Sequence, residues 1–238
     1  MRKSLAVSII SLLCLAIPEP AYSAHFSAVE TRKIFDDYAV CVVKSHHKLA
    51  SKAILADVDN SQIISNYDAL ISSECMGQVG GAVQAKFTGD SYRYALADAL
   101  VNADFRDSGP TNFADRLPTA HMLPPTQAQL KTVLSETKSR RKQEELKAGF
   151  HKENVIASLS RYGECVVCED PVAARYWLLT KPDVPEEISR ISALRPAFSD
   201  CLVGATITFT KDIMRGVVAI NYHRLAMATP QPSAGTSK

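Results

Sequence analysis

The chain has 238 residues, of which 46% are hydrophobic and 22% are charged. This balance excludes a wholly disordered or low-complexity chain and allows one large domain or two small ones. The formal net charge is only +2. Because a nucleic-acid-binding protein normally carries a concentrated basic face, we expect no nucleic acid among the partners.

The first 23 residues have the pattern of a secretory signal peptide. Two basic residues at 2–3 precede an apolar run over 5–17, and residues 21–23 place small side chains at the positions that direct cleavage. The apolar run is shorter than the roughly 20 residues that cross a bilayer, which disfavours an uncleaved membrane anchor. We therefore expect cleavage near Ser23/Ala24, a periplasmic or secreted protein, and no transmembrane segment after cleavage.

Export determines how the cysteines are interpreted, because cysteines of exported proteins are usually bridged. One of the six cysteines, Cys14, belongs to the expected signal peptide. The others are Cys41, Cys75, Cys165, Cys168 and Cys201. An odd number leaves one thiol without a partner in the same chain.

Two stretches of the chain resemble each other in order and spacing. Residues 38–43 read Tyr-Ala-Val-Cys-Val-Val, and residues 162–167 read Tyr-Gly-Glu-Cys-Val-Val. Further along, Ser-Glu-Cys at 73–75 matches Ser-Asp-Cys at 199–201. An ordered series of matches indicates a tandem duplication rather than chance similarity.

The duplication divides the chain into five segments. We expect a signal peptide at 1–23, a first copy at 24–105, a loop and charged linker helix at 106–149, a second copy at 150–226, and a disordered tail at 227–238. The linker helix is expected to begin near Gln127, and it could continue into the first helix of the second copy. The tail holds two prolines and several small residues, as disordered termini often do.

The alignment of the copies suggests the disulfide pairing. Cys41 matches Cys165 and Cys75 matches Cys201, whereas Cys168 falls opposite a lysine. The economical pairing is therefore Cys41–Cys75 and Cys165–Cys201, with Cys168 as a free thiol. Pairing between the copies stays open, since connectivity does not follow from sequence alone.

Apolar residues recur at helical spacing in both copies, which predicts a mainly α-helical protein. Ser27 and Ser61 are expected helix N-caps, and Pro185 is expected in the first turn of a helix. Residues 83–87 and 205–209 have the alternation and β-branched content of short strands. If these strands pair, a short two-stranded β-ribbon links the copies.

Arg93 and Arg215 occupy matching positions, each three residues after an aspartate, Asp90 or Asp212. Thr210 is expected to cap the second of the two helices that carry them. One interpretation is a pair of arginines that bind an anion at helix N-termini. The other, which we favour, is an ion pair within each helix between residues three apart.

Two further patterns could carry chemistry. Cys165 and Cys168 have the CxxC spacing of thiol oxidoreductases, but the pattern falls inside an expected helix instead of at its start. His46 and His47 could bind a metal, but adjacent helical residues point about 100° apart. We expect no metal site, no cofactor and no catalytic residues, because no nucleophile–base motif is present.

The second copy resembles a group of exported, uncharacterised Gram-negative bacterial proteins that carry a YxxCVV…AR..LL…C…F…RG pattern, sometimes twice. The resemblance implies export and a duplicated unit, and no known activity accompanies it. The first copy departs from the pattern at Tyr94, where the second has Gly216. The residues that carry the resemblance are Tyr162 to Val167, Ala173 to Arg175, Leu178, Leu179, Cys201, Phe209, Arg215 and Gly216.

These patterns favour an exported, non-catalytic binding or structural protein of the cell envelope. Its partner would be a protein, peptide or envelope component held at a face or groove between the copies. A thiol-redox protein using Cys165 and Cys168 is one alternative. A carrier of small anions using Arg93 and Arg215 is another, and it requires both arginines to line one cavity.

Overall fold

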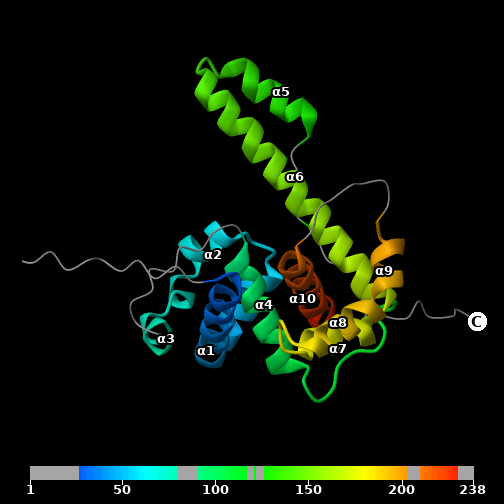
Figure 1. Ribbon diagram of the computed structural model, residues 1–238. Coiled ribbons are helices and arrows are strands. Elements are labelled where there is room, and N and C mark those ends of the chain that lie inside the picture. Colours follow the sequence, from blue (N-terminus) through cyan, green and yellow to red (C-terminus); the bar gives the residue numbers. More distant parts are fainter. Residues whose placement is uncertain (1–26, 80–89, 117–120, 122–125, 203–209, 230–238) are drawn as a thin grey trace, which may run out of the picture.

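The computed structural model describes residues 27–79, 90–116, 121, 126–202 and 210–229. These residues form ten α-helices and one short 3-10 helix (Figure 1). The expectation of a mainly α-helical protein is confirmed. The two expected strands, the signal peptide and nearly all of the tail lie outside the described residues.

The first half of the fold is built on two long helices that pack side by side, α1 and α4. Two short helices and a 3-10 turn connect them and cover one end of the pair. The bounds are α1 Ala28–Leu55, α2 Asn60–Asn66, the 3-10 helix Asp68–Leu70, α3 Ser73–Gln78 and α4 Ser91–Asp104.

The second half begins with a helical hairpin that stands out from the rest of the molecule (Figure 1). Its second helix, α6, then continues into the body and packs against α10. The expected boundary between linker and second copy at 149/150 thus falls inside one continuous helix. The bounds are α5 Gln127–Glu136, α6 Arg140–Glu169, α7 Pro171–Leu179, α8 Pro185–Ala193, α9 Arg195–Asp200 and α10 Lys211–Met227.

Several helices begin at a residue whose side chain caps the first turn. Ser27 and Thr210 cap α1 and α10 as expected, each accepting a hydrogen bond from a backbone N–H in the first turn. The expectation for Ser61 is wrong. Asp59 caps that helix instead. Its carboxylate accepts a hydrogen bond from the backbone N–H of Gln62, and the Gln62 side chain accepts one from the backbone N–H of Asp59, which completes a capping box.

Each half contains one disulfide. Cys41–Cys75 joins α1 to α3, and Cys165–Cys201 joins α6 to the residue that follows α9. These are the two pairs that the repeat suggested, and Cys168 is free and exposed. Loops of 34 and 36 residues are closed. Closing a loop of that length stabilises a fold by about 3 to 4 kcal/mol in the chain-entropy model.

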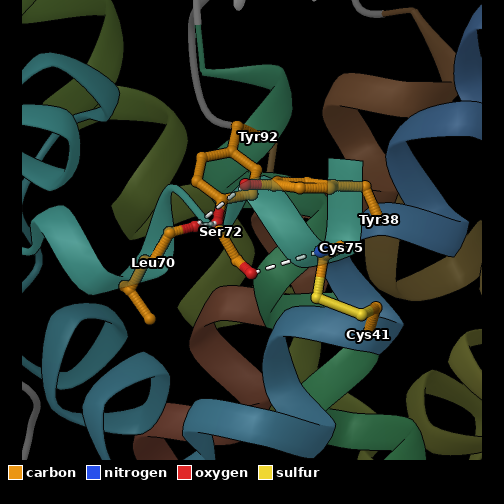
Figure 2. Close-up of a disulfide and its surroundings, with 6 residues drawn as sticks. All are labelled: Tyr38, Cys41, Leu70, Ser72, Cys75 and Tyr92. Carbon is orange, nitrogen blue, oxygen red and sulfur yellow. Dashed lines mark hydrogen bonds between the residues drawn. A yellow bond between two sulfur atoms is a disulfide. The ribbon is translucent and has the colours of Figure 1, made fainter. Parts of the chain in front are cut away.

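A tyrosine hydroxyl bonds to a backbone carbonyl shortly before the second cysteine of each disulfide. In the first half Tyr38 and Tyr92 both donate to the carbonyl of Leu70, beside the disulfide (Figure 2). In the second half Tyr162 donates to the carbonyl of Phe198. Each bond satisfies a buried polar group next to a covalent link, so the cysteine-bearing segment is held at two points.

The two halves meet where α4 packs against α10 (Figure 1). Gly216 on α10 lies directly against Tyr94 on α4, so a Cβ atom at Gly216 would come within 2.1 Å of the Tyr94 Cγ. A side chain at this position would therefore push the helices apart. The departure of the first copy from the repeat pattern has a steric reason, because the tyrosine of one helix fills the space that the glycine of the other leaves open.

Replacing Gly216 by alanine is expected to lower the free energy of unfolding by about 1 to 3 kcal/mol, the usual cost of overpacking. The clash involves the rigid base of the Tyr94 side chain, which cannot rotate away. Chemical denaturation of the single and double variants gives the measurement. The Gly216→Ala change should cost clearly less in a Tyr94→Ala background, and additive effects would contradict the contact.

Candidate functional site

A pocket of about 760 Å³ opens between the two halves, with walls from α1 and α4 on one side and α6 and α10 on the other. Its volume lies within the range of about 300 to 1,000 Å³ typical of small-molecule sites. Two other cavities among the described residues, of about 510 and 10 Å³, border α7–α8 and the α4–α6–α10 contact. The large pocket is therefore the candidate site.

One side of the pocket is apolar. Val155, Ile156 and Leu159 of α6 fall on one face of that helix because they are spaced one and four residues apart. Phe35 of α1 and Tyr94 of α4 add two aromatic rings. Tyr94 thus has two roles, since it also packs against Gly216 at the junction of the halves.

The other side of the pocket is charged. Arg32 and Asp36 reach it from α1, Asp98 from α4, and Asp212 and Arg215 from α10. Burial and the neighbouring Asp98 carboxylate raise the pKa of Asp36 to about 7, against the opposing effect of the two arginines. Burial also raises the pKa of Asp98. The pocket therefore combines an apolar side with a charged side, on which the carboxylates of Asp36, Asp98 and Asp212 outnumber the two arginines.

Arg215 is almost fully enclosed, with 3% of its surface exposed. Its guanidinium bonds to both carboxylate oxygens of Asp98 at 3.1 Å and to Glu187 at 3.4 Å. It also donates to the carbonyls of Trp177, Leu178 and Thr180, at the C-terminal end of α7. A cation at that end of a helix is favoured by the helix dipole.

The expected ion pair between Asp212 and Arg215 is wrong. Asp212 pairs with Arg32 of α1 instead. The physical reason is orientation, since Arg215 faces the interior, where Asp98 and Glu187 lie, and Asp212 is 60% exposed.

Arg93 occupies the matching position in the first half and is also buried, but its carboxylate partner is Asp57 just beyond the end of α1. Arg224 approaches the same carboxylate at 3.3 Å. Asp57 has a positive φ of 54°, a backbone conformation that aspartate tolerates better than most residues. The expected pair with Asp90 is thus replaced by a long-range pair, and Arg93 does not line the large pocket.

A hydroxyl, an imidazole and a carboxylate meet elsewhere, at the contact between α1, α4 and α10. Ser51 Oγ lies 3.0 Å from His223 Nε2, and His223 Nδ1 lies 3.7 Å from Asp104. His47 reaches the same carboxylate at 2.6 Å. Sequence inspection missed this group because its members come from three distant helices without a motif.

This group does not border any of the three cavities described above. His223 has 0% of its surface exposed and Ser51 has 7%. Burial lowers the pKa of His223 to about 4, which makes the imidazole a weak base at neutral pH. The arrangement resembles a catalytic triad in composition, but its serine and imidazole are buried, and its carboxylate lies 3.7 Å from the imidazole.

The CxxC pattern also lacks the features of a redox site. Cys165 is bonded to Cys201, so it is not paired with Cys168. Packing around the Cys168 sulfur and the carboxylates of Glu164 and Glu169 raise the pKa of the thiol. Reactive thiols have lowered pKa values, so this environment disfavours the thiol-redox alternative.

His46 and His47 lie in α1 at a kink, where His46 leaves helical geometry. His47 is engaged by Asp104. A search of the described residues finds no group of three or more His, Cys, Asp or Glu side chains that could hold a metal ion.

Sequence reasoning singled out Arg215, Asp90 and Asp212, which line the pocket, but missed Asp36 and Asp98. A signal for one of them is present, because Asp98 interrupts the run of small and apolar residues from Ala95 to Val101. An acid inside such a run is unusual unless it is paired. Asp36 gives no comparable signal, because it lies among other charged residues on α1.

Comparisons with protein-family models, with curated proteins and with solved structures find no match to this chain. The candidate site therefore rests on its geometry alone.

We expect Arg215→Met to lower the free energy of unfolding by about 3 to 5 kcal/mol, because Asp98 loses its close cation and three carbonyls at the end of α7 lose their donor. Arg215→Lys should recover only part of this loss, since lysine lacks the planar fork that reaches several acceptors. Arg190→Met is the control. Arg190 forms an exposed ion pair with Glu186, and its loss should cost less than about 1 kcal/mol. Equal losses for Arg215→Met and Arg190→Met would contradict the role of Arg215.

His223 is expected to destabilise the fold in acid. Its folded pKa of about 4 lies below the unfolded value near 6.5, so the unfolded chain takes up the proton first. The contribution of His223 to the free energy of unfolding is fully present above about pH 6.5. It declines as the pH falls toward 4, by on the order of 3 kcal/mol in total.

Asp36 has the opposite effect on stability in an overlapping pH range: its pKa is raised in the folded protein, so the folded state gains stability as the pH falls. The two effects are separated by measuring the free energy of unfolding of the unmodified protein and of His223→Gln by denaturation at several pH values, and taking the difference at each pH. This difference should change between about pH 6.5 and pH 4. His151→Gln, at an exposed histidine, should leave the pH dependence intact; a flat difference for His223→Gln would refute the assignment.

Proposed function

We propose that this protein is an exported, non-catalytic binding protein that holds its ligand in the pocket between its two halves. The observation that carries the proposal is the pocket of about 760 Å³ lined by α1, α4, α6 and α10. Elements from both halves form its walls, as expected for a site at the junction of two structural units. The pocket also corresponds in position to the groove between copies that the repeat suggested.

Export is supported by two kinds of observation. The first 23 residues have the pattern of a cleaved signal peptide. Two disulfides are typical of proteins from oxidising compartments. These two observations support the periplasmic or secreted location that we propose. Among the described residues, no helix has the length and apolar character needed to cross a bilayer.

We also propose that the two halves arose by tandem duplication. Corresponding features support this proposal: one disulfide in each half, and a tyrosine bonded to a carbonyl near each second cysteine. Arg93 and Arg215 each reach the region where an earlier helix of their own half ends. In each half an aspartate with positive φ follows that helix, Asp57 or Asp183.

The carrier of small anions, with Arg93 and Arg215 in one cavity, receives less support. Arg215 borders the large pocket, and Arg93 borders a different cavity of about 10 Å³. Arg215 is also bonded to two carboxylates and three carbonyls, so its donors are committed. The apolar side and the carboxylates of the large pocket are better suited to a ligand other than a small anion.

The pocket can be tested with N-phenyl-1-naphthylamine, a neutral apolar dye that fluoresces when it leaves water. The protein should bind the dye, and Ile213→Trp, which fills the pocket from α10, should weaken binding about tenfold or more, equivalent to ~1.4 kcal/mol. Ile188→Trp is the matched control, because Ile188 is 70% exposed on α8 and does not line the pocket. Absence of dye binding, or equal affinity in both variants, would refute the proposal.

A further inference from the structure

The charged residues that line the pocket from α1, α4 and α10 belong to a larger ionic cluster. Arg32 lies 3.9 Å from each of Asp36, Asp183 and Glu187, and it bonds to Asp212. Lys211 and Arg215 connect to the same group through Asp183, Glu187 and Asp98. These contacts join α1, α4, α8 and α10 at one point.

The cluster holds more negative than positive charge. It contains three cations, Arg32, Lys211 and Arg215, and five carboxylates, Asp36, Asp98, Asp183, Glu187 and Asp212. With all groups ionised, two carboxylates have no cation to balance them. An uncompensated negative charge next to a partly desolvated cavity is costly, and an added cation would relieve that cost.

Asp36 is the carboxylate that is least compensated. The ion pair recorded for it within the described residues is the 3.9 Å contact with Arg32, and Arg32 has a closer partner in Asp212. The Asp36 side chain is 30% exposed and lines the pocket. It is therefore both accessible to a ligand and short of positive charge.

The basic side chains on the facing wall form no ion pair with Asp36 within the described residues. His151 and Lys152 line the pocket from α6 and are exposed, whereas the ion pair of Asp36 is with Arg32. Lys152 also acts electrostatically on Asp59. An anionic ligand would add to the excess of negative charge, whereas a ligand with an ammonium group would offset it.

The geometry points to an amphipathic amine as the ligand: an ammonium group at Asp36 and an apolar body against Val155, Ile156 and Leu159. This inference rests on the proposed function, because it names the class of ligand that the pocket holds. The charge-assisted bond between ammonium and carboxylate fixes the head of the ligand. Burial of the apolar body against α6 contributes the hydrophobic part of the affinity.

Three ligands of equal chain length distinguish the charge preference from general apolar binding. Octylamine, octanol and octanoate are compared as competitors that displace N-phenyl-1-naphthylamine at about pH 8, where the amine is protonated. Octylamine should displace the dye at a concentration about tenfold or more below those of octanol and octanoate. Equal potency of octylamine and octanol would overturn the amine assignment and leave the proposed function standing. If the dye itself fails to bind, the proposed function and the inference fail together.

A pair of adjacent variants locates the ammonium group. Asp36→Asn removes the charge with little change of shape and should abolish the preference for octylamine. Asp37→Asn is the matched control, because Asp37 lies next to Asp36 on α1, pairs with Lys33 and does not line the pocket. The preference should persist in Asp37→Asn; its persistence in Asp36→Asn as well would overturn the assignment. Thermal melting of both variants verifies that they are folded.

The pH dependence gives a second readout. Octylamine affinity should rise several-fold from about pH 6 to about pH 8, because Asp36, whose pKa is about 7, loses its proton while the amine keeps its own. The rise should be absent in Asp36→Asn. A rise that persists in the variant would assign the effect to another group and overturn the role of Asp36. The charged or titratable groups that line the pocket with Asp36 are Arg32, Asp90, Tyr94, Asp98, His151, Lys152, Asp212 and Arg215.

Discussion

The enclosed guanidinium of Arg215 is the contact on which the second half of the fold depends. It connects α10 to Asp98 of α4, to Glu187 of α8 and to the carbonyls at the end of α7. A buried arginine is tolerated only when its donors are satisfied, and these partners satisfy them. The same side chain borders the pocket, so the interaction that assembles four helices also fixes one part of the candidate site.

The junction of the halves depends on an asymmetry between matching positions. Tyr94 and Gly216 fall at matching positions in the sequence alignment of the two halves and contact each other across the α4–α10 interface. Two large side chains could not both fit where the helices approach so closely. The glycine permits the approach, and the tyrosine fills the space and extends to the pocket wall. Close packing of the two halves and the formation of the pocket are therefore linked.

Two of the polar groups among the described residues lie apart from each other in the fold. Ser51, His223 and Asp104 meet away from the pocket, with Ser51 and His223 buried and Asp104 at the surface. The pocket has one apolar side and one charged side. Its described lining includes no cysteine and one histidine, His151, which is exposed.

The helices and the disulfides could be predicted because the signals for them are local or repeated. Apolar spacing, Ser27 and Thr210 as caps, and Pro185 at the start of α8 depend on residues within one or two turns. The pairs Cys41–Cys75 and Cys165–Cys201 follow from the register of two similar segments. The position of Asp59 as a cap was missed because two neighbouring side chains could serve and only one forms the reciprocal bond.

The partners of the buried charges could not be predicted in the same way. Sequence spacing favoured Asp90 for Arg93 and Asp212 for Arg215, yet the partners are Asp57 and, for Arg215, Asp98 and Glu187. The sequence by itself determined the helical class and favoured the disulfide pairs that the structure contains. Only the tertiary structure decided which carboxylates they meet and that Asp36 faces a cavity. Those outcomes depend on how helices distant in the chain are oriented and packed, which residue spacing within one helix does not specify.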